Sequence, residues 1–254
     1  MFLAIDVGNT QSTLGLFDEE GALVHGWRMA TDHTDTSDSL HSRLWGYFNK
    51  DGLDMGAVTD AGLACVVPVL TRAWRRCLTS LLGREPHVVG PGAECGMELD
   101  VPNPGQVGAD RVANAFAARE TYGAPVIVVD FGTATNIDVV NRDGAYCGGA
   151  ISPGLMLSAN ALFSRAAKLS SVPIEAPASA LGNTTETAVQ SGLVIGAAAQ
   201  AEGLVGRIKA ELGIEGATVV GTGGLARTVS HATDLFDAID PDLTLRGIRS
   251  ISLG

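Results

Sequence analysis

The 254-residue chain has 17 Lys and Arg against 28 Asp and Glu, and this net charge of −11, without a cluster of basic residues, excludes a nucleic-acid-binding protein. Hydrophobic residues make up 46% of the chain and charged residues 18%, which suffices for a real core and excludes a disordered chain. Neither a run of about 18 apolar residues nor a basic leader with a long apolar stretch occurs, so we expect a cytoplasmic protein without membrane contact.

The first half opens on two apolar runs, at 2–5 and 13–17, which flank the polar turn Asp6-Val7-Gly8-Asn9-Thr10. This pattern predicts a strand, a tight turn and a second strand. Further elements are predicted downstream as a strand at 61–67, a helix at 70–82, a strand at 87–89 and a helix at 111–122. The first half therefore reads as an α/β domain.

The second half repeats this opening, with apolar runs at 126–129 and 137–140 around the turn Asp130-Phe131-Gly132-Thr133-Ala134-Thr135. Helices are predicted at 158–169 and 185–212, and a strand at 217–220 ends in Gly221-Thr222-Gly223-Gly224. The repeat predicts two similar α/β domains, at 1–118 and 119–254. The helix at 111–122 is expected to bridge them.

The turn that begins at Asp6 has the composition of a phosphate-binding turn. Gly8 lets the backbone approach a ligand closely, and the backbone amides and Thr hydroxyls can bind oxygen anions. The Asp6 carboxylate would repel phosphate, so its expected role is to hold Mg²⁺, directly or through water. The alternative is an ordinary hairpin turn in which Asp6 and Asn9 only supply turn geometry.

The turn that begins at Asp130 repeats the same chemistry, which favours phosphate binding over the plain-turn alternative. The glycine-rich segment at 221–224 follows a predicted strand and suits the close approach of an adenosine, with Gly223 as the expected contact. A single Thr-Gly-Gly is weak evidence, because most such segments are turns that lead into helices. The three segments in this order predict a protein that binds ATP between two domains.

Paired Asp-x-Gly hairpins followed by a glycine-rich segment resemble the acetate and sugar kinase, Hsp70 and actin superfamily. Within it, the chain resembles the type III pantothenate kinases over nearly its full length. The stretches that carry this resemblance are 6–10, 65–68, 87–92, 103–104, 108–111, 130–135, 148–154, 185, 190–192 and 241–247. The most diagnostic of them are Gly108-Ala109-Asp110-Arg111 and Asp130 to Thr135.

The resemblance implies two ribonuclease H-like (actin-like) domains, a homodimer, and transfer of phosphate from ATP with Mg²⁺ to pantothenate. Asp110 is implied to be the general base, Asp130 the ligand of a monovalent cation (K⁺ or NH₄⁺), and Thr133 an ATP contact. The implied first phosphate loop consists of Asp6, Val7, Gly8, Asn9, Thr10, Gln11, Ser12 and Thr13. The implied pantothenate contacts are Gly108, Ala109, Asp110, Arg111 and Thr185.

The residues themselves leave two roles open for Asp110, which stands at the start of a predicted helix. The helix dipole there favours an ionised carboxylate, which can accept a proton. The alternative is a helix N-cap, a frequent role of Asp. Arg111 suits the carboxylate of pantothenate, or else forms a surface ion pair with Glu120 or Asp100.

Three positions depart from the usual pattern of this family: Val101 replaces a common tyrosine, Asn136 a threonine and Gln11 a frequent asparagine. Because the tyrosine contacts pantothenate in the family, Val101 puts the substrate contacts in question. Two alternatives to pantothenate phosphorylation therefore stay open. One is another small-molecule kinase of the same superfamily, and the other is a nucleotide-binding regulatory protein without turnover.

Overall fold

The computed structural model describes residues 1–90, 95–165 and 171–254. It divides into two compact units. The first comprises Met1–Met97, Pro102–Ala117 and Leu243–Gly254, and the second comprises Glu98–Val101 and Ala118–Asp242. The C-terminal helix therefore returns to the first unit. A division of the chain into domains at 1–118 and 119–254 stays a prediction.

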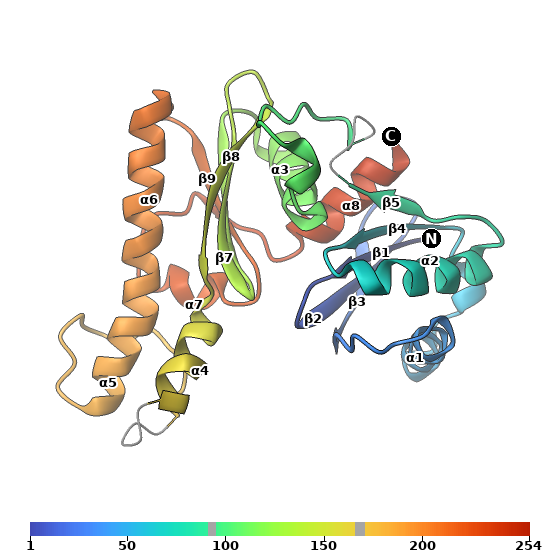
Figure 1. Ribbon diagram of the computed structural model, residues 1–254, viewed down its shortest axis with the longest axis horizontal. Helices are drawn as coiled ribbons and strands as arrows, with labels where there is room; N and C mark the ends of the chain where they lie inside the picture. Colours follow the sequence, from blue (N-terminus) through green and yellow to red (C-terminus); the bar gives the residue numbers. More distant parts are fainter. Residues whose placement is uncertain (91–94, 166–170) are drawn as a thin grey trace. The chain divides into compact units, whose positions relative to one another are not determined.

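The first unit is built on a five-stranded sheet with the order β3-β2-β1-β4-β5 (Figure 1). The strands are β1 (Phe2–Val7), β2 (Gln11–Phe17), β3 (Leu23–Ala30), β4 (Asp60–Cys65) and β5 (His87–Val89). β1 pairs antiparallel with β2 and parallel with β4, so that Asp6 lies between Thr13 and Ala64. The first predicted turn thus stands at the carboxyl end of a central strand, where ligands of α/β proteins bind.

Helices α1 (Ser37–Lys50) and α2 (Pro68–Leu82) pack their apolar sides onto the core of this sheet. The apolar side of α1 consists of Leu40, Leu44 and Phe48, which recur every fourth residue along one side of the helix. Helix α8 (Leu243–Leu253) packs against β1 and β4. Its Gly247 lies so close to the backbone of Ala113 that a Cβ there would overlap the Ala113 carbonyl oxygen.

The second unit repeats the sheet, with the order β10-β9-β6-β7-β8. Its strands are β6 (Val126–Phe131), β7 (Ala134–Val140), β8 (Tyr146–Pro153), β9 (Thr218–Thr222) and β10 (Ala238–Ile239). β6 pairs antiparallel with β7 and parallel with β9, so that Asp130 lies between Asn136 and Thr222. Asp130 therefore occupies in this sheet the place that Asp6 occupies in the first. The prediction of a duplicated α/β fold is confirmed.

The helices of the second unit are α4 (Leu155–Arg165), α5 (Thr185–Gln190), α6 (Gly196–Leu212) and α7 (Ala226–Ser230). The helix predicted at 185–212 is present, but its Ser191–Ile195 segment is a π-helix. The helix predicted at 158–169 begins earlier, at Leu155, and the end of that prediction, at 166–169, lies outside the described residues. In the described part of the chain, no helix has the length and apolar character to cross a membrane.

Helix α3 (Ala109–Tyr122) begins two residues before the predicted start at Arg111. Its residues up to Ala117 belong to the first unit and those from Ala118 to the second. The helix thus carries the chain from one unit into the other. Asp110 and Arg111 stand in its first turn, within the first unit.

Candidate active site

The turn after β1 is closed by its own backbone. The Gly8 N–H donates a hydrogen bond to the Gln11 carbonyl oxygen at 3.1 Å. A Cβ at position 8 would stand 2.9 Å from that oxygen, which explains the glycine. Asn9, Thr10 and Gln11 are exposed at the tip, whereas the Ser12 side chain is buried. The predicted phosphate loop is therefore a tight hairpin with an open tip.

The chain segment after β3 also contacts this hairpin, through Thr31 and His33. Neither residue belongs to the site predicted from the sequence. The available signal was a run of polar residues at 31–39, directly after an alternating strand. Which loop this run would contact depends on the pairing of β2 with β3, so the sequence alone did not connect it to the turn.

Val66 connects the hairpin with the start of α3. Its backbone N–H donates to the carbonyl oxygen of Val7 at 3.1 Å. Its Cγ1 would stand 3.5 Å from a Cβ at position 108. The structure therefore brings two of the predicted groups, the first phosphate loop and the Gly108–Arg111 segment, to one edge of the first unit.

Asp110 lies inside the first turn of α3, so the alternative that it is the N-cap of this helix is wrong. Its Oδ1 accepts a hydrogen bond from the backbone N–H of Arg111 at 2.8 Å. That bond satisfies one amide of the helix start and uses one carboxylate oxygen. A side chain at position 108 would overlap Oδ1, so Gly108 makes the space that the carboxylate occupies.

Burial raises the pKa of the Asp110 carboxyl above its ordinary value. The hydrogen bond from the Arg111 backbone and the Arg111 guanidinium oppose this shift, because both stabilise the ionised form. A carboxylate with a raised pKa holds a proton more readily than a solvated one. Such a carboxyl group can serve as a proton acceptor, and it lies at the edge of the first unit that also carries the first hairpin.

In the second unit, the Asp130 carboxylate lies among glycines. A Cβ at Gly223 would overlap Asp130 Oδ1, and a Cβ at Gly132 would stand 3.4 Å from it. Gly223 also has a φ of +88°, a conformation that residues with side chains rarely adopt. The glycine-rich segment and the second Asp turn, both predicted from the sequence, thus form one continuous site at the carboxyl ends of β6 and β9.

Thr133 lies exposed at the tip of the same turn. Its carbonyl oxygen accepts a hydrogen bond from the Gly154 N–H at 3.2 Å. A Cβ at Gly154 would overlap that oxygen and would stand 2.6 Å from the Gly132 carbonyl oxygen. Gly154, which lies between β8 and α4, therefore packs directly against the backbone of this turn and stabilises it.

Thr185 lies in a different part of the second unit, as the first residue of α5. It lines a cavity of about 500 Å³ with Leu162 of α4 and Gly192 and Leu193 of the π-helical segment. A second cavity of about 260 Å³ shares Gly192 and Leu193 and reaches Thr135. The predicted pantothenate contacts therefore fall in both units, with Gly108–Arg111 in the first and Thr185 in the second.

Within the residues that the structure describes, no three His, Cys, Asp or Glu side chains gather as a metal site. A lone Asp6 carboxylate fits Mg²⁺, since this ion keeps several waters and binds protein through one or two carboxylates together with phosphate oxygens. At the second turn, the Asp130 carboxylate supplies the negative charge that a monovalent cation would need, and Gly132 and Gly223 leave room for this carboxylate.

The family model and the curated relative that match this chain carry the same description. The family model described as type III pantothenate kinase matches residues 2–207. The chain is 43% identical over 251 residues to the type III pantothenate kinase of Moorella thermoacetica, covering 99% of this chain and 98% of that protein.

Among solved structures, the fold resembles a putative Baf family transcriptional activator from Campylobacter jejuni, with a TM-score of 0.63 and 16% identity over 98% of this chain and 96% of that one. It also resembles a putative 2-dehydro-3-deoxygalactonokinase from Sinorhizobium meliloti, with a TM-score of 0.61 and 17% identity over 99% and 95% of the two chains. At these identities the structural neighbours establish the fold alone, a duplicated α/β fold with two five-stranded sheets.

Proposed function

The chain belongs to the type III pantothenate kinase family, and we propose on that basis that it transfers the γ-phosphoryl group of ATP to pantothenate, with Asp110 as the general base. The products are ADP and 4′-phosphopantothenate, at the first step of coenzyme A synthesis. The observation that best supports this role is the half-buried Asp110 carboxyl with its raised pKa, which lies beside Val66 at the edge that carries the first phosphate loop.

In this reaction the Asp110 carboxylate accepts the proton of the primary hydroxyl of pantothenate. The hydroxyl oxygen forms a bond to the γ-phosphorus of ATP, and the bond from that phosphorus to the β–γ bridging oxygen breaks to release ADP. Such a transfer requires chiefly positioning and charge neutralisation. One acceptor for the proton and firm binding of the phosphates are therefore sufficient protein chemistry.

Residues 6–13 bind phosphate oxygens of ATP, and Thr133 and Gly223 of the second unit add further ATP contacts. The Asp6 carboxylate would hold Mg²⁺, and this ion would supply positive charge to the phosphates. The Asp130 carboxylate would hold K⁺ or NH₄⁺, which would offset negative charge beside the second turn. These assignments rest on the open tip of the first hairpin and on the Asp130 carboxylate, which Gly132 and Gly223 accommodate at the second turn.

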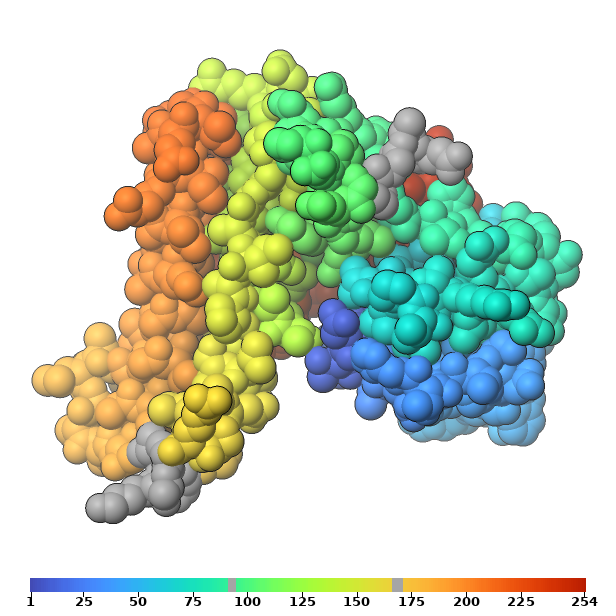
Figure 2. All heavy atoms as spheres, viewed as in Figure 1, coloured from blue at the N-terminus to red at the C-terminus, as the bar shows by residue number. Residues whose placement is uncertain are grey.

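The Gly108–Arg111 segment and Thr185 bind pantothenate, with the Arg111 guanidinium suited to its carboxylate. We also propose a cytoplasmic homodimer, as the family resemblance implies. Several large apolar side chains are exposed on β8 and α4 of the second unit, the segments drawn in yellow in Figure 2. They are Ile151, Met156, Leu157 and Leu162. A second copy of the chain would cover these side chains, which supports an interface there.

The reaction is tested by measuring ADP formation from ATP, Mg²⁺ and K⁺ with pantothenate added or omitted. We expect ADP to form only when pantothenate is added, with one ADP for each pantothenate consumed. Mass spectrometry should identify the second product as 4′-phosphopantothenate. ADP formation that requires a different small molecule would indicate another kinase of the superfamily. ATP binding without turnover on any acceptor would instead indicate a regulatory protein.

Val101 offers a test of the substrate contacts. If the family's tyrosine donates a hydrogen bond to pantothenate, its absence costs about 0.5–1.5 kcal/mol, up to roughly tenfold in affinity. We therefore expect Val101→Tyr to lower the KM for pantothenate by up to about tenfold, with the KM for ATP unchanged. Steady-state kinetics with each substrate varied in turn provide the measurement. A higher KM for pantothenate would show that the pocket is built without a place for the tyrosine.

A further inference from the structure

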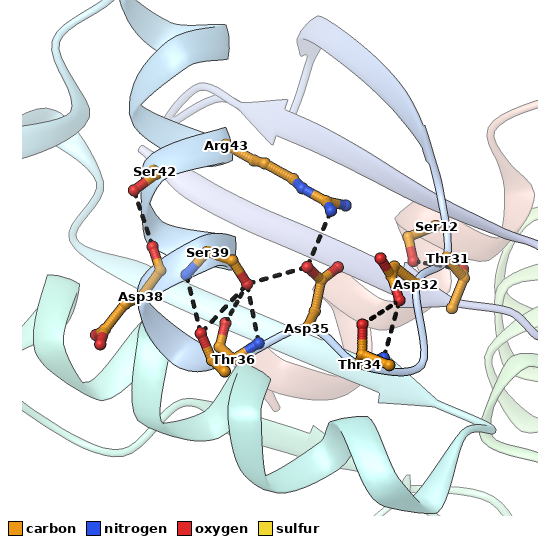
Figure 3. Close-up of polar contacts among 10 residues, drawn as sticks. All are labelled: Ser12, Thr31, Asp32, Thr34, Asp35, Thr36, Asp38, Ser39, Ser42 and Arg43. Carbon is orange, nitrogen blue, oxygen red and sulfur yellow. Dashed lines mark hydrogen bonds and ion pairs between the residues drawn. The ribbon is translucent and has the colours of Figure 1, made fainter.

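The first phosphate loop is held by the chain segment that follows β3, which lies outside the site predicted from the sequence. Thr31, directly after β3, makes three hydrogen bonds to the hairpin. Its hydroxyl donates to the Gly8 carbonyl oxygen at 2.8 Å and lies 2.9 Å from the Ser12 hydroxyl, and its backbone N–H donates to the Thr10 carbonyl oxygen at 3.0 Å. Figure 3 shows the contact between Thr31 and Ser12.

The directions of these bonds can be assigned from the chemistry of the groups. The Thr31 hydroxyl has one proton, and the Gly8 carbonyl oxygen can only accept it. The bond between the two hydroxyls must then run from Ser12 to Thr31. Ser12 is 1% exposed, so its proton is directed to Thr31 inside the structure and is not available to a ligand in this arrangement.

A third carbonyl of the hairpin is contacted from the same segment. His33 Nε2 lies 3.2 Å from the Asn9 carbonyl oxygen, which requires a proton on Nε2. Three successive carbonyl groups, those of residues 8, 9 and 10, are thus bound by Thr31 or His33. In a trans peptide the N–H points away from the carbonyl of the same unit. The segment therefore fixes the directions of the N–H groups of residues 9, 10 and 11.

The segment that carries Thr31 is itself fixed at both ends. On one side the pairing of Gln11 with Ala30 holds the end of β3 against β2. On the other side Thr36 and Ser39 form a capping box at the start of α1. Figure 3 shows this arrangement, in which the Asp35 carboxylate also accepts from the Ser39 hydroxyl at 3.0 Å and pairs with Arg43 at 2.9 Å.

We propose that Thr31 is a positioning residue for ATP: it orients the backbone amides at the tip of the first phosphate loop without touching the nucleotide. This proposal rests on the proposed function, and it adds how residues 6–13 are held in position for ATP. Ser12 then contributes through Thr31, and His33 makes a smaller contribution through Asn9. The physical basis is preorganisation, since amides already aimed at the phosphates need no reordering when ATP binds.

The test uses the full chain with ATP, Mg²⁺ and K⁺, and it compares Thr31→Val with Thr31→Ser. Valine keeps the shape but leaves the Gly8 carbonyl and the buried Ser12 hydroxyl without Thr31 as a partner. We expect the dissociation constant and the KM for ATP to rise about tenfold, and the KM for pantothenate to stay within about twofold. Thr31→Ser keeps the hydroxyl and should stay within about threefold of the wild type for ATP.

Thr34→Val is the matched control. The Thr34 hydroxyl and N–H both bond to Asp32 Oδ1, at 2.7 and 2.9 Å, and the residue is exposed. Removal of the Thr34 hydroxyl should leave the affinity for ATP unchanged. His33 is exposed, so we expect His33→Ala to fold. It should weaken ATP binding about threefold. This variant keeps the proposal testable if Thr31→Val does not fold.

Calorimetric titration with ATP and steady-state kinetics on these variants distinguish the outcomes. ATP affinity that is unchanged in His33→Ala and in every Thr31 variant that folds would overturn the role of the segment and leave the kinase assignment intact. An equal loss of ATP and pantothenate affinity in Thr31→Val would also overturn it, since that pattern indicates general damage. A wild-type chain that does not bind ATP would overturn the positioning role together with the proposed function.

Discussion

Asp110→Asn should lower kcat for pantothenate phosphorylation by about 10²–10⁴-fold, the usual contribution of a general base. Asparagine has nearly the size of aspartate, so it fits the space above Gly108. Its amide can still accept the hydrogen bond from the Arg111 N–H through the side-chain oxygen. What it cannot do is accept the proton of the substrate hydroxyl. The measurement is kcat at saturating ATP and pantothenate.

Two controls separate catalysis from folding in this experiment. The first is Glu120→Gln, which removes one negative charge from the exposed end of the same helix and should leave kcat unchanged. The second is the affinity for ATP by calorimetry, which Asp110→Asn should preserve. If kcat barely changes, Asp110 is not the base. If kcat and ATP affinity are lost together, the substitution has damaged the phosphate loop as well.

The pKa of Asp110 also predicts the direction of the stability change. Because burial raises this pKa in the folded state, the ionised carboxylate destabilises the fold at neutral pH. The cost is absent at pH values below the pKa of the unfolded chain, and it develops as the pH rises through the raised pKa. Asp110→Asn removes the cost, so its Tm at pH 7 should equal or exceed that of the wild type, and a lower Tm would contradict the raised pKa.

Asp130→Asn should abolish the dependence of activity on K⁺ or NH₄⁺ and lower kcat/KM about 10²-fold. The amide keeps the size that the surrounding glycines allow but removes the charge that would hold the cation. Without the cation the turn loses its fixed position beside ATP, and a misplacement of about 1 Å costs roughly that factor. The measurement is activity against K⁺ concentration at constant ionic strength, with Na⁺ as the replacement.

The matched control for this substitution is Asp143→Asn, which neutralises an exposed aspartate in the turn between β7 and β8 of the same unit. It should keep both the activity and the response to K⁺. Full wild-type turnover in a sodium-only buffer would show that Asp130 does not serve a required monovalent cation. An unchanged K⁺ response in Asp130→Asn would place the cation elsewhere.

The strands around the two Asp turns could be predicted because their information is local. β1 and β2, like β6 and β7, contain apolar runs on either side of an Asp-x-Gly turn, and these runs are buried on both sides of the sheet. The edge strands β3 and β8 were missed. In both, buried side chains are few and polar or glycine residues alternate along the strand, so the pattern resembles a loop.

Among the helices that were not predicted, α1 and α8 differ in what the sequence offered. α1 had a readable signal, with Thr36 as N-cap and apolar residues at 40, 44 and 48. α8 also has an apolar side, but its location could not be inferred. It packs in the first unit because Gly62 and Gly247 permit close approach to Ser252 and Ala113. Such contacts join residues far apart in the chain, and no local pattern encodes them.

The two Asp turns, their repetition in both halves, the glycine-rich segment after β9 and Asp110 as a candidate base could all be predicted from the sequence, because each depends on a short motif. The tertiary structure decided what surrounds them. It placed the half-buried Asp110 carboxyl beside Gly108, set Gly223 against Asp130, and brought Thr31 to the first turn. Sheet pairing and burial create these environments, and both depend on contacts between segments that the chain order keeps apart.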